Sequence, residues 1–250
     1  MSEEKLKKYN LLVGAICKNN AKHMPNVLTN IEQYAKLFSS CRTLFIDGHS
    51  TDGTFEIVKD WCKKDSKHRD VYKQPLSYLS RSHSLTEGRN MIIILLEKYF
   101  QKNTYLLLLD TDEVNAAPVD INSFLTNFNY PTNTWDAMFA NQSKEYYDIW
   151  ALRSKECPYD CWQMVRQFGN QKEFVDKHQK HYPTSTPIEE VDSAFGGSGL
   201  YHTEKLTECR YAGYINKDGR SVEICEHVPF HYELKKKGAK LFINFAWINH

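Results

Sequence analysis

The sequence places an acidic tripeptide directly after a run of leucines, and its chemistry is most visible there. Residues 105–109 are Tyr-Leu-Leu-Leu-Leu, and Asp110, Thr111 and Asp112 follow them. A short, uninterrupted apolar run predicts a strand buried on both faces, and open α/β sheets bind ligands just beyond such strand ends. Two carboxylates one residue apart can share Mg²⁺ or Mn²⁺, which in turn can hold a diphosphate. Taken alone, such a tripeptide is more often a solvated acidic loop, so the rest of the chain must decide.

Three other polar residues have similar potential. Asp47 follows the apolar segment 43–46, where an acid can accept hydrogen bonds from a ribose or a base. Arg81 and Arg89 flank the start of a predicted helix, and Arg89 can offer its guanidinium fork to phosphate or pyrimidine oxygens. Either arginine alone is more often a solvated helix residue. The sequence has no Gly-x-Gly-x-x-Gly after its first predicted strand and no P-loop, which disfavours the NAD and ATP folds that use them.

The first half of the chain must position these residues, and it alternates between two hydrophobic periods. Apolar runs predict strands over 11–16, 43–46, 71–72 and 105–109, while helical spacing predicts helices over 24–37, from about 54, and over 82–100. Ser50 or Thr51 is the expected N-cap of the second helix. This β-α-β-α-β-α-β order predicts an α/β fold with a doubly wound, mostly parallel sheet.

The second half of the chain is more mixed. Asp120 is expected to cap a short helix ending near residue 128, and a pair of strands is expected over 135–141 and 146–152. Residues 158–187 read as irregular, with a helix near 171–180. The glycine-rich segment 195–201 should lead into a strand, and 226–231 should precede a short helix and a strand over 241–245. We expect one domain, 1–250, with halves of about 10–115 and 116–250.

Composition excludes several classes of function. The chain has 250 residues, 41% of them hydrophobic and 25% charged, which is typical of a globular protein. A net charge of +1 argues against a nucleic-acid partner. The polar first residues and the short aliphatic run 91–96 predict neither a signal peptide nor a membrane span, so we expect a cytoplasmic protein. The seven cysteines form no Cys-x-x-Cys pair, and free thiols are favoured over a Cys157–Cys161 bridge.

Several segments together resemble a known family. Residues 46–54, Ile-Asp-Gly-His-Ser-Thr-Asp-Gly-Thr, resemble a segment of nucleotide-sugar glycosyltransferases with the GT-A fold. Arg81, the Gly88-Arg89-Asn90 segment and the Asp-Thr-Asp tripeptide keep that family's order and spacing. Further matching blocks are 135–137, 146–153, 193–197 and 225–227, so the resemblance covers about 10–245. It is closest to the branch with capsule-associated mannosyltransferase-like enzymes of fungi and related enzymes of bacteria and large DNA viruses. A viral member would act in the host cytoplasm.

The resemblance implies a fold and an activity. The fold would be a GT-A, Rossmann-like mixed sheet, mostly parallel in its nucleotide-binding half (10–115), with a smaller acceptor-side α+β half (116–250). The activity would be metal-dependent transfer of a hexose from a UDP- or GDP-sugar to a glycan or glycoside acceptor. One alternative is a non-catalytic nucleotide- or carbohydrate-binding domain of the same fold. Another is a nucleotidyltransferase, although residues 15–20 lack the Gly-rich, basic segment usual in those enzymes.

The resemblance also implies roles for the donor-side residues. Asp47 would contact the base, as the only acid in a place where the family often has two, and Arg89 would lie near the base or diphosphate. Asp112 would bind the metal directly, Asp110 would be shared between ribose and metal, and Glu113 would be solvated or supporting. A C-terminal histidine would complete the metal site; His227 fits that place best, and His231 is the alternative. Imidazole beside carboxylates suits Mn²⁺ better than Mg²⁺.

The acceptor side leaves more alternatives open. An inverting enzyme needs a carboxylate base, for which the candidates are Asp148, Asp192 and Glu226, at most one of them. A retaining enzyme needs none. Trp150 lies in an aromatic block that can stack on sugar rings or belong to the core. Gly196 and Gly197 can let the backbone approach the donor sugar, or can form a tight turn.

Overall fold

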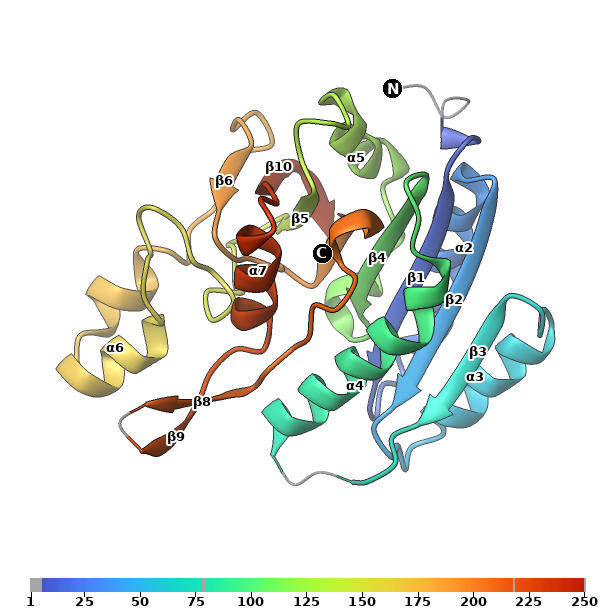
Figure 1. The fold of residues 1–250 in the computed structure, drawn as a ribbon, viewed down its shortest axis with the longest axis horizontal. Helices are drawn as coiled ribbons and strands as arrows, with labels where there is room; N and C mark the ends of the chain where they lie inside the picture. The colour runs from blue at the N-terminus through green and yellow to red at the C-terminus, as the bar shows by residue number, and fades with distance from the viewer. Residues whose placement is uncertain (1–5, 78–79, 218, 250) are drawn as a thin grey trace.

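The computed structural model describes residues 6–77, 80–217 and 219–249, and its first half is the predicted βα alternation. The elements follow in the order expected from the hydrophobic pattern (Figure 1). They are β1 (Asn10–Cys17), α2 (Met24–Leu37), β2 (Ser40–Asp47), α3 (Thr54–Lys63), β3 (Arg69–Lys73), α4 (Arg81–Leu96), η1 (Glu97–Tyr99) and β4 (Thr104–Asp110).

The second half completes the sheet with strands of both directions. Its elements are η2 (Glu113–Asn115), α5 (Ile121–Leu125), η3 (Thr126–Asn129), β5 (Ala137–Gln142), α6 (Cys161–Phe168), η4 (Lys172–Asp176), β6 (Glu189–Val191), β7 (Ser198–His202), η5 (Thr203–Lys205), β8 (Tyr214–Lys217), β9 (Arg220–Glu223), α7 (His227–Lys236) and β10 (Leu241–Asn249). The eight-stranded sheet has the order β3-β2-β1-β4-β7-β5-β10-β6, and β8 and β9 form a separate hairpin. Strands β3, β2, β1 and β4 are parallel, whereas β7 is antiparallel to both β4 and β5. The predicted mixed α/β sheet is therefore confirmed.

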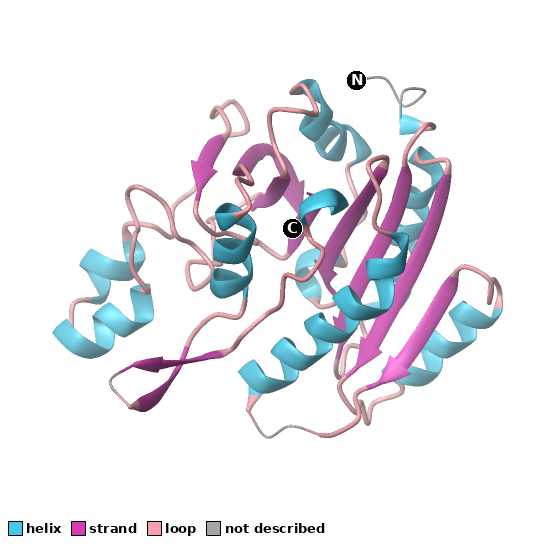
Figure 2. Cartoon of the chain, in the orientation of Figure 1, coloured by secondary structure: helices cyan, strands magenta, loops and turns pink. Residues whose placement is uncertain are grey.

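The leucine run is the centre of this sheet. Residues 105–109 of β4 are each at most 3% exposed. Leu106 and Leu108 pack with Ile92 of α4, while the alternate residues of β4 face the cluster that contains α2. Figure 2 shows α4 crossing one face of the parallel strands with α2 behind them. Gly14 of β1 lies under α4, where a Cβ atom would collide with Ile92. Burial on both faces explains why the run does not alternate between apolar and polar residues.

Three local predictions were wrong, two of them because a long-range contact replaced the expected one. Residues 146–152 form a loop and not a strand, because β7 and β10 occupy both edges of β5. The N-cap of α3 is Gly53, at φ 94°, because the Ser50 hydroxyl accepts instead from the Asn19 N–H. Helix α7 begins at His227 and therefore includes residues expected to precede it. Asp120 caps α5 as predicted, and the expected helix near 171–180 is the short π-helix η4.

Several elements of the second half were not predicted. They are α6, β6 and the β8–β9 hairpin.

Within the described ranges, no helix has the length and apolar character required to cross a lipid bilayer.

Candidate active site

The carboxyl end of β4 opens onto two clefts. One, of about 410 Å³, extends toward the end of β1 and is lined by Lys18, Asn19 and Asn20; we name it the β1-side cleft. The other, of about 370 Å³, extends toward the start of α7, and we name it the α7-side cleft. Four residues line both clefts: Arg81, Leu85, Asp110 and Asp112. A larger hollow of about 650 Å³ lies at the amino-terminal ends of β2 and β3, away from these acids.

Arg89 is the electrostatic centre of the α7-side cleft. Its Nε donates to Glu226 Oε1 at 2.9 Å and its Nη2 donates to Asp110 Oδ1 at 3.1 Å. The guanidinium lies over the Phe195 ring, 4.7 Å from its centroid, and is almost completely buried. Burial opposes the charge of Arg89, but Glu226 and Asp110 outweigh it and raise the pKa of Arg89. A permanent cation therefore joins α4, β4 and the start of α7.

The two acids of the tripeptide have different environments. Burial raises the pKa of Asp110 to about 7, and the opposing effect of Arg89 does not cancel this. Its backbone N–H donates to the Gly197 carbonyl at 2.9 Å, which connects β4 to the glycine turn before β7. Asp112 is exposed and uses one oxygen to cap η2 through the Val114 N–H. Asp112 is thus the acid with free coordination capacity.

The two candidate histidines also differ. His231 is fully buried, with Nδ1 hydrogen-bonded to Ser193 and Nε2 to Tyr201. His227 lines the α7-side cleft and stacks on Phe195 with ring centroids 4.0 Å apart. Among the described residues, neither ring nitrogen has a hydrogen-bond partner, and Nε2 lies 3.7 Å from Glu226 Oε1. Burial, with the nearby charge of Arg89, holds the pKa of His227 well below its usual range, so its imidazole is neutral. The neutral, unpartnered ring of His227 has the chemistry of a ligand, whereas the ring of His231 is committed to the core.

The donor set of Asp110, Asp112 and His227 fits Mn²⁺ or Mg²⁺ in chemistry but is not gathered into one centre. Among the described residues, the trio of acid, His or Cys ligand atoms found within 4.8 Å of one another lies elsewhere. Arg89 already holds one oxygen of Asp110. Asp112, supported by Asp110, is therefore the better candidate among the three residues to hold a divalent cation. His227 becomes a third ligand only if a conformational change brings its ring closer to the two acids.

The three candidate bases are separated by the structure. Glu226 lines the α7-side cleft, but Arg89 holds its carboxylate. Asp192 lines neither cleft, and its carboxylate pairs with Lys235 of α7. Asp148 lines the α7-side cleft and accepts from the Gly196 N–H at 3.0 Å. Burial raises the pKa of Asp148, partly offset by the hydrogen bond from Gly196.

The glycine turn brings the backbone close to both halves of the site. Gly196 and Gly197 have φ of 62° and 78°. A Cβ on Gly196 would collide with the Ala140 carbonyl, and one on Gly197 would lie 2.7 Å from Val114. Only glycine tolerates this conformation without strain. The geometry of the turn thus requires glycine at both positions. The turn also orients Asp148 through the Gly196 N–H.

Aromatic and basic side chains line the outer part of the α7-side cleft. Trp150 lines it and donates from Nε1 to Asp160 at 3.0 Å. Tyr147 is 43% exposed there, and α6 contributes Trp162 and Arg166, which are four residues apart on one helix face. Sequence reasoning missed these α6 residues. The signal that marks α6 is its caps, because Asp160 accepts from Gln163 N–H and Gly169 ends the helix in the left-handed conformation.

The two remaining predicted donor-side residues lie in different places. Arg81, at the start of α4, is exposed and lines both clefts. Asp47 is fully buried, accepts from the Ser50 N–H at 3.1 Å and lines neither cleft. In this conformation Asp47 organises the 47–54 turn.

Solved structures with a similar fold include a mannosyltransferase, PcManGT from Pyrobaculum calidifontis, in complex with GDP-Man and Mn²⁺. It is 13% identical, with a TM-score of 0.55, and the match covers 97% of this chain and 56% of that one. S. aureus TarS 1–349 in complex with UDP-GlcNAc is 11% identical, with a TM-score of 0.53 over 94% of this chain and 55% of that one. This chain thus spans about half the length of these structures. Neither a family model nor a curated protein matches the sequence. The structural likenesses confirm the predicted GT-A fold.

Proposed function

We propose that this protein is a metal-dependent glycosyltransferase that moves a hexose from a UDP- or GDP-sugar to a glycan or glycoside acceptor. The observation that carries the proposal is the position of Asp110 and Asp112 at the junction of two clefts. A donor has to bind with its diphosphate at such a junction, its nucleoside on one side and its sugar facing the acceptor on the other. The β1-side cleft belongs to the half formed by residues 10–115, and the α7-side cleft is lined mostly by residues from 116–250.

The β1-side cleft offers the groups that a nucleoside diphosphate requires. Lys18 and Arg81 are cations that suit phosphate oxygens. Asn20 is held in place because its Oδ1 accepts from the Lys18 N–H and the Thr111 hydroxyl. The two structural neighbours with bound donors hold GDP-Man and UDP-GlcNAc, which supports a nucleotide diphosphate sugar as the donor class. Asp47 would reach a base only if the 47–54 turn rearranged.

Asp112, with Asp110, would hold Mn²⁺ or Mg²⁺ at the junction. When bound, the cation would neutralise charge that develops on the leaving diphosphate. The neighbour that holds GDP-Man also holds Mn²⁺, which supports a divalent cation as the cofactor. Arg89 supplies a second, permanent positive charge beside Asp110, and it is held by Glu226 rather than by solvent.

Asp148 is the best placed of the three acids to act as the base in an inverting transfer. It lines the cleft that would receive the acceptor, and none of the described Lys, Arg or His side chains forms an ion pair with its carboxylate. A raised pKa makes a carboxylate a stronger proton acceptor for a sugar hydroxyl. Trp150 and Trp162, which both line this cleft, offer flat apolar surfaces for sugar rings.

The direct test measures donor hydrolysis and transfer with Mn²⁺ over a panel of UDP- and GDP-sugars. We expect turnover that EDTA abolishes and Mn²⁺ restores. Asp112→Asn should lower turnover by about a hundredfold or more, because the metal loses its main ligand. The matched control is Glu113→Gln, which removes the adjacent exposed acid and should change turnover less than about threefold.

Each alternative function has its own outcome. A non-catalytic binding domain would leave every donor intact. A nucleotidyltransferase would also leave the donors intact, but it would release pyrophosphate when supplied with a nucleoside triphosphate and a sugar phosphate. Full turnover by Asp112→Asn would contradict the assignment of the tripeptide.

A further inference from the structure

Residues 154–180 contribute no strand to the sheet and have almost no apolar core of their own. Helix α6 buries only Cys161, and η4 buries only Val175. Phe168, at the end of α6, is 57% exposed. Units that bury little apolar surface are commonly held together by a disulfide or a metal ion. The polar and thiol side chains that this segment does bury are therefore candidates for such a disulfide or metal site.

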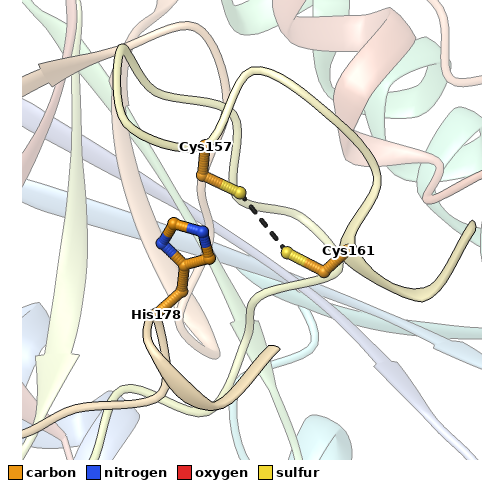
Figure 3. A group of neighbouring side chains, drawn as sticks. All are labelled: Cys157, Cys161 and His178. Carbon is orange, nitrogen blue, oxygen red and sulfur yellow. Dashed lines mark hydrogen bonds between the residues drawn. The ribbon is translucent and has the colours of Figure 1, made fainter. Parts of the chain in front are cut away.

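These buried side chains include two thiols and an imidazole that meet at one point. Cys157 precedes α6, Cys161 is its first residue, and His178 follows η4. The two cysteines are completely buried and His178 is 4% exposed. The sulfur atoms are 3.3 Å apart, and all three ligand atoms lie within 4.8 Å of one another. Figure 3 shows the three side chains converging from separate stretches of chain.

The spacing of these atoms matches a tetrahedral metal site. Ligands about 2.0–2.3 Å from one zinc ion lie about 3.5–3.8 Å from each other, so only small side-chain shifts are required. Two sulfurs and one nitrogen are soft or borderline donors, which favour Zn²⁺ over Mg²⁺, Ca²⁺ or Mn²⁺. The sulfurs are too far apart for a disulfide, whose S–S length is about 2.05 Å. All seven cysteines are free in this structure.

The surroundings support metal binding. The Nε2 atom of His178 is hydrogen-bonded to the Tyr159 hydroxyl at 3.0 Å. A metal bound through Nδ1 would keep this bond, which then orients the ring, and a metal bound through Nε2 would replace it.

We propose that Cys157, Cys161 and His178 bind a structural Zn²⁺ ion, with a water or a nearby oxygen in the fourth position. The ion would join the start of α6 to the end of η4 and replace the missing apolar core. Asp160 connects the same helix start to Trp150 and Arg153. The site would thereby hold the helix that presents Trp162 and Arg166 to the α7-side cleft. It is separate from the Asp112 site and does not depend on the proposed glycosyl transfer.

Cobalt substitution tests the site in the intact wild-type protein. The reduced chain is stripped of metal with a chelator and titrated with Co²⁺ without oxygen. We expect a thiolate-to-cobalt charge-transfer band and strong visible bands of a tetrahedral ion, which saturate at equimolar Co²⁺ and disappear when Zn²⁺ is added. A cation on Asp110 and Asp112 has no thiolate ligand and cannot produce the charge-transfer band. Absence of this band would overturn the proposal.

Variants and chemical mapping identify the ligands. Cys161→Ser should abolish the charge-transfer band, whereas Cys41→Ser, which alters a half-buried cysteine on β2, should keep it. If Cys161→Ser does not fold, alkylation of the wild type settles the question by mass spectrometry. Zn²⁺ should then slow alkylation of Cys157 and Cys161 by at least tenfold and leave the other five cysteines unchanged. Equal rates with and without Zn²⁺, or a Cys157–Cys161 disulfide that persists after reduction, would contradict the assignment.

Stability provides an independent measurement. Removal of Zn²⁺ should lower the Tm by about 5 °C or more, because a structural metal contributes its binding free energy to folding. The shift should be reversed by Zn²⁺ and should be absent in His178→Gln. A chelator-induced shift of the same size in His178→Gln would show that the stabilising metal binds elsewhere.

Discussion

At the scale of single residues, Arg89 determines what its neighbours can do. It is buried with two carboxylates, Asp110 and Glu226, and lies over the ring of Phe195. A carboxylate that holds a buried guanidinium is not free to move to an acceptor hydroxyl, because the move would leave the cation without its partner. Glu226 is therefore a positioning residue in our proposal, and Asp148 is the base. Two substitutions separate these roles.

The first substitution is Glu226→Ala, for which we expect a large loss of stability. It leaves Arg89 buried with Asp110 alone, and breaking a buried pair in this way costs about 3–5 kcal/mol. Urea unfolding measures the free energy of unfolding. The control is Glu233→Ala, an exposed residue of the same helix, which should change that free energy by less than about 0.5 kcal/mol. A stable Glu226→Ala protein that has lost only activity would instead indicate a catalytic carboxylate.

The second substitution is Asp148→Asn, for which we expect normal folding and a loss of about 10²–10⁴ in kcat. The base acts in its deprotonated form, so the wild-type rate should rise with pH through a pKa above the usual range of aspartate. This dependence of the rate on pH at the acidic end of the profile should be absent in the variant. Asp192→Asn is the matched control and should keep the wild-type profile, because Asp192 pairs with Lys235 outside the clefts. If the rate of Asp148→Asn still rose with pH in the same way, the titrating group would be a residue other than Asp148.

At the scale of elements, the pair β4 and β7 connects the two halves of the chain. Residues 105–109 of β4 pair antiparallel with 198–202 of β7, and the glycine turn that leads into β7 approaches the acids at the end of β4. At the other end of this pair, His202 packs between Tyr105 and Trp135, with ring centroids 4.5 and 4.6 Å away. None of the residues that the structure describes forms a hydrogen bond with the Nε2 atom of His202. This imidazole is held in its neutral form.

The pairing of β4 and β7 should therefore weaken in acid. Burial lowers the pKa of His202 to about 4, opposed in part by Asp136, while an unfolded chain has a histidine pKa of about 6.5. Below pH 6.5 the unfolded state binds the proton first, so stability present at neutral pH is lost as the pH falls from about 6.5 to about 4. His202 should account for about 2–3 kcal/mol of this loss.

Urea unfolding at a series of pH values checks this expectation. The variant His202→Leu should show a shallower loss of stability over the same window. His231, with a pKa of about 3, and His227 should contribute losses of the same sign in both proteins, so the difference between the two curves isolates His202. Parallel curves would show that His202 does not titrate on unfolding.

At the scale of the whole molecule, a donor would contact both halves at once. The two clefts share Asp110 and Asp112, but one is lined by the loop after β1 and the other by loops of the second half. A ligand that binds only the folded chain stabilises it by an amount that grows with the logarithm of the ligand concentration relative to Kd, and the apparent Tm rises accordingly. The complete donor should therefore stabilise the protein more than the nucleoside diphosphate alone.

A thermal-shift screen of UDP, GDP and their sugars, with and without Mn²⁺, tests this expectation. At a donor concentration of about a hundred times Kd the gain is about 2.7 kcal/mol, which for a chain of this size corresponds to a rise of about 5–10 °C. The shift should require Mn²⁺ and should be lost in Asp112→Asn. A shift with every nucleotide, independent of the metal, would indicate nonspecific anion binding.

The sequence alone determined the frame of this protein. The leucine run predicted β4, its buried position and the acids at its end, because a strand covered on both faces must be apolar at every position. The alternating periods of the first half predicted the parallel strands, and the motif order predicted the GT-A fold. The strands and helices are local in sequence, so a short window contains the information they require, whereas the GT-A fold was predicted from the order of motifs over residues 10–245.

Only the tertiary structure decided which of the candidate residues meet. Arg89 and Glu226 are 137 positions apart, and no local pattern indicates their ion pair. The sequence does not distinguish His227 from His231 as a ligand. In the structure, Ser193 and Tyr201 form hydrogen bonds with both ring nitrogens of His231, whereas among the described residues those of His227 have no such partner. Residues 146–152 carry a strand-like pattern but form a loop, because other strands already occupy the edges of β5. Charge pairing, hydrogen-bond satisfaction and strand edges depend on distant parts of the chain, and so they are fixed only when the chain has folded.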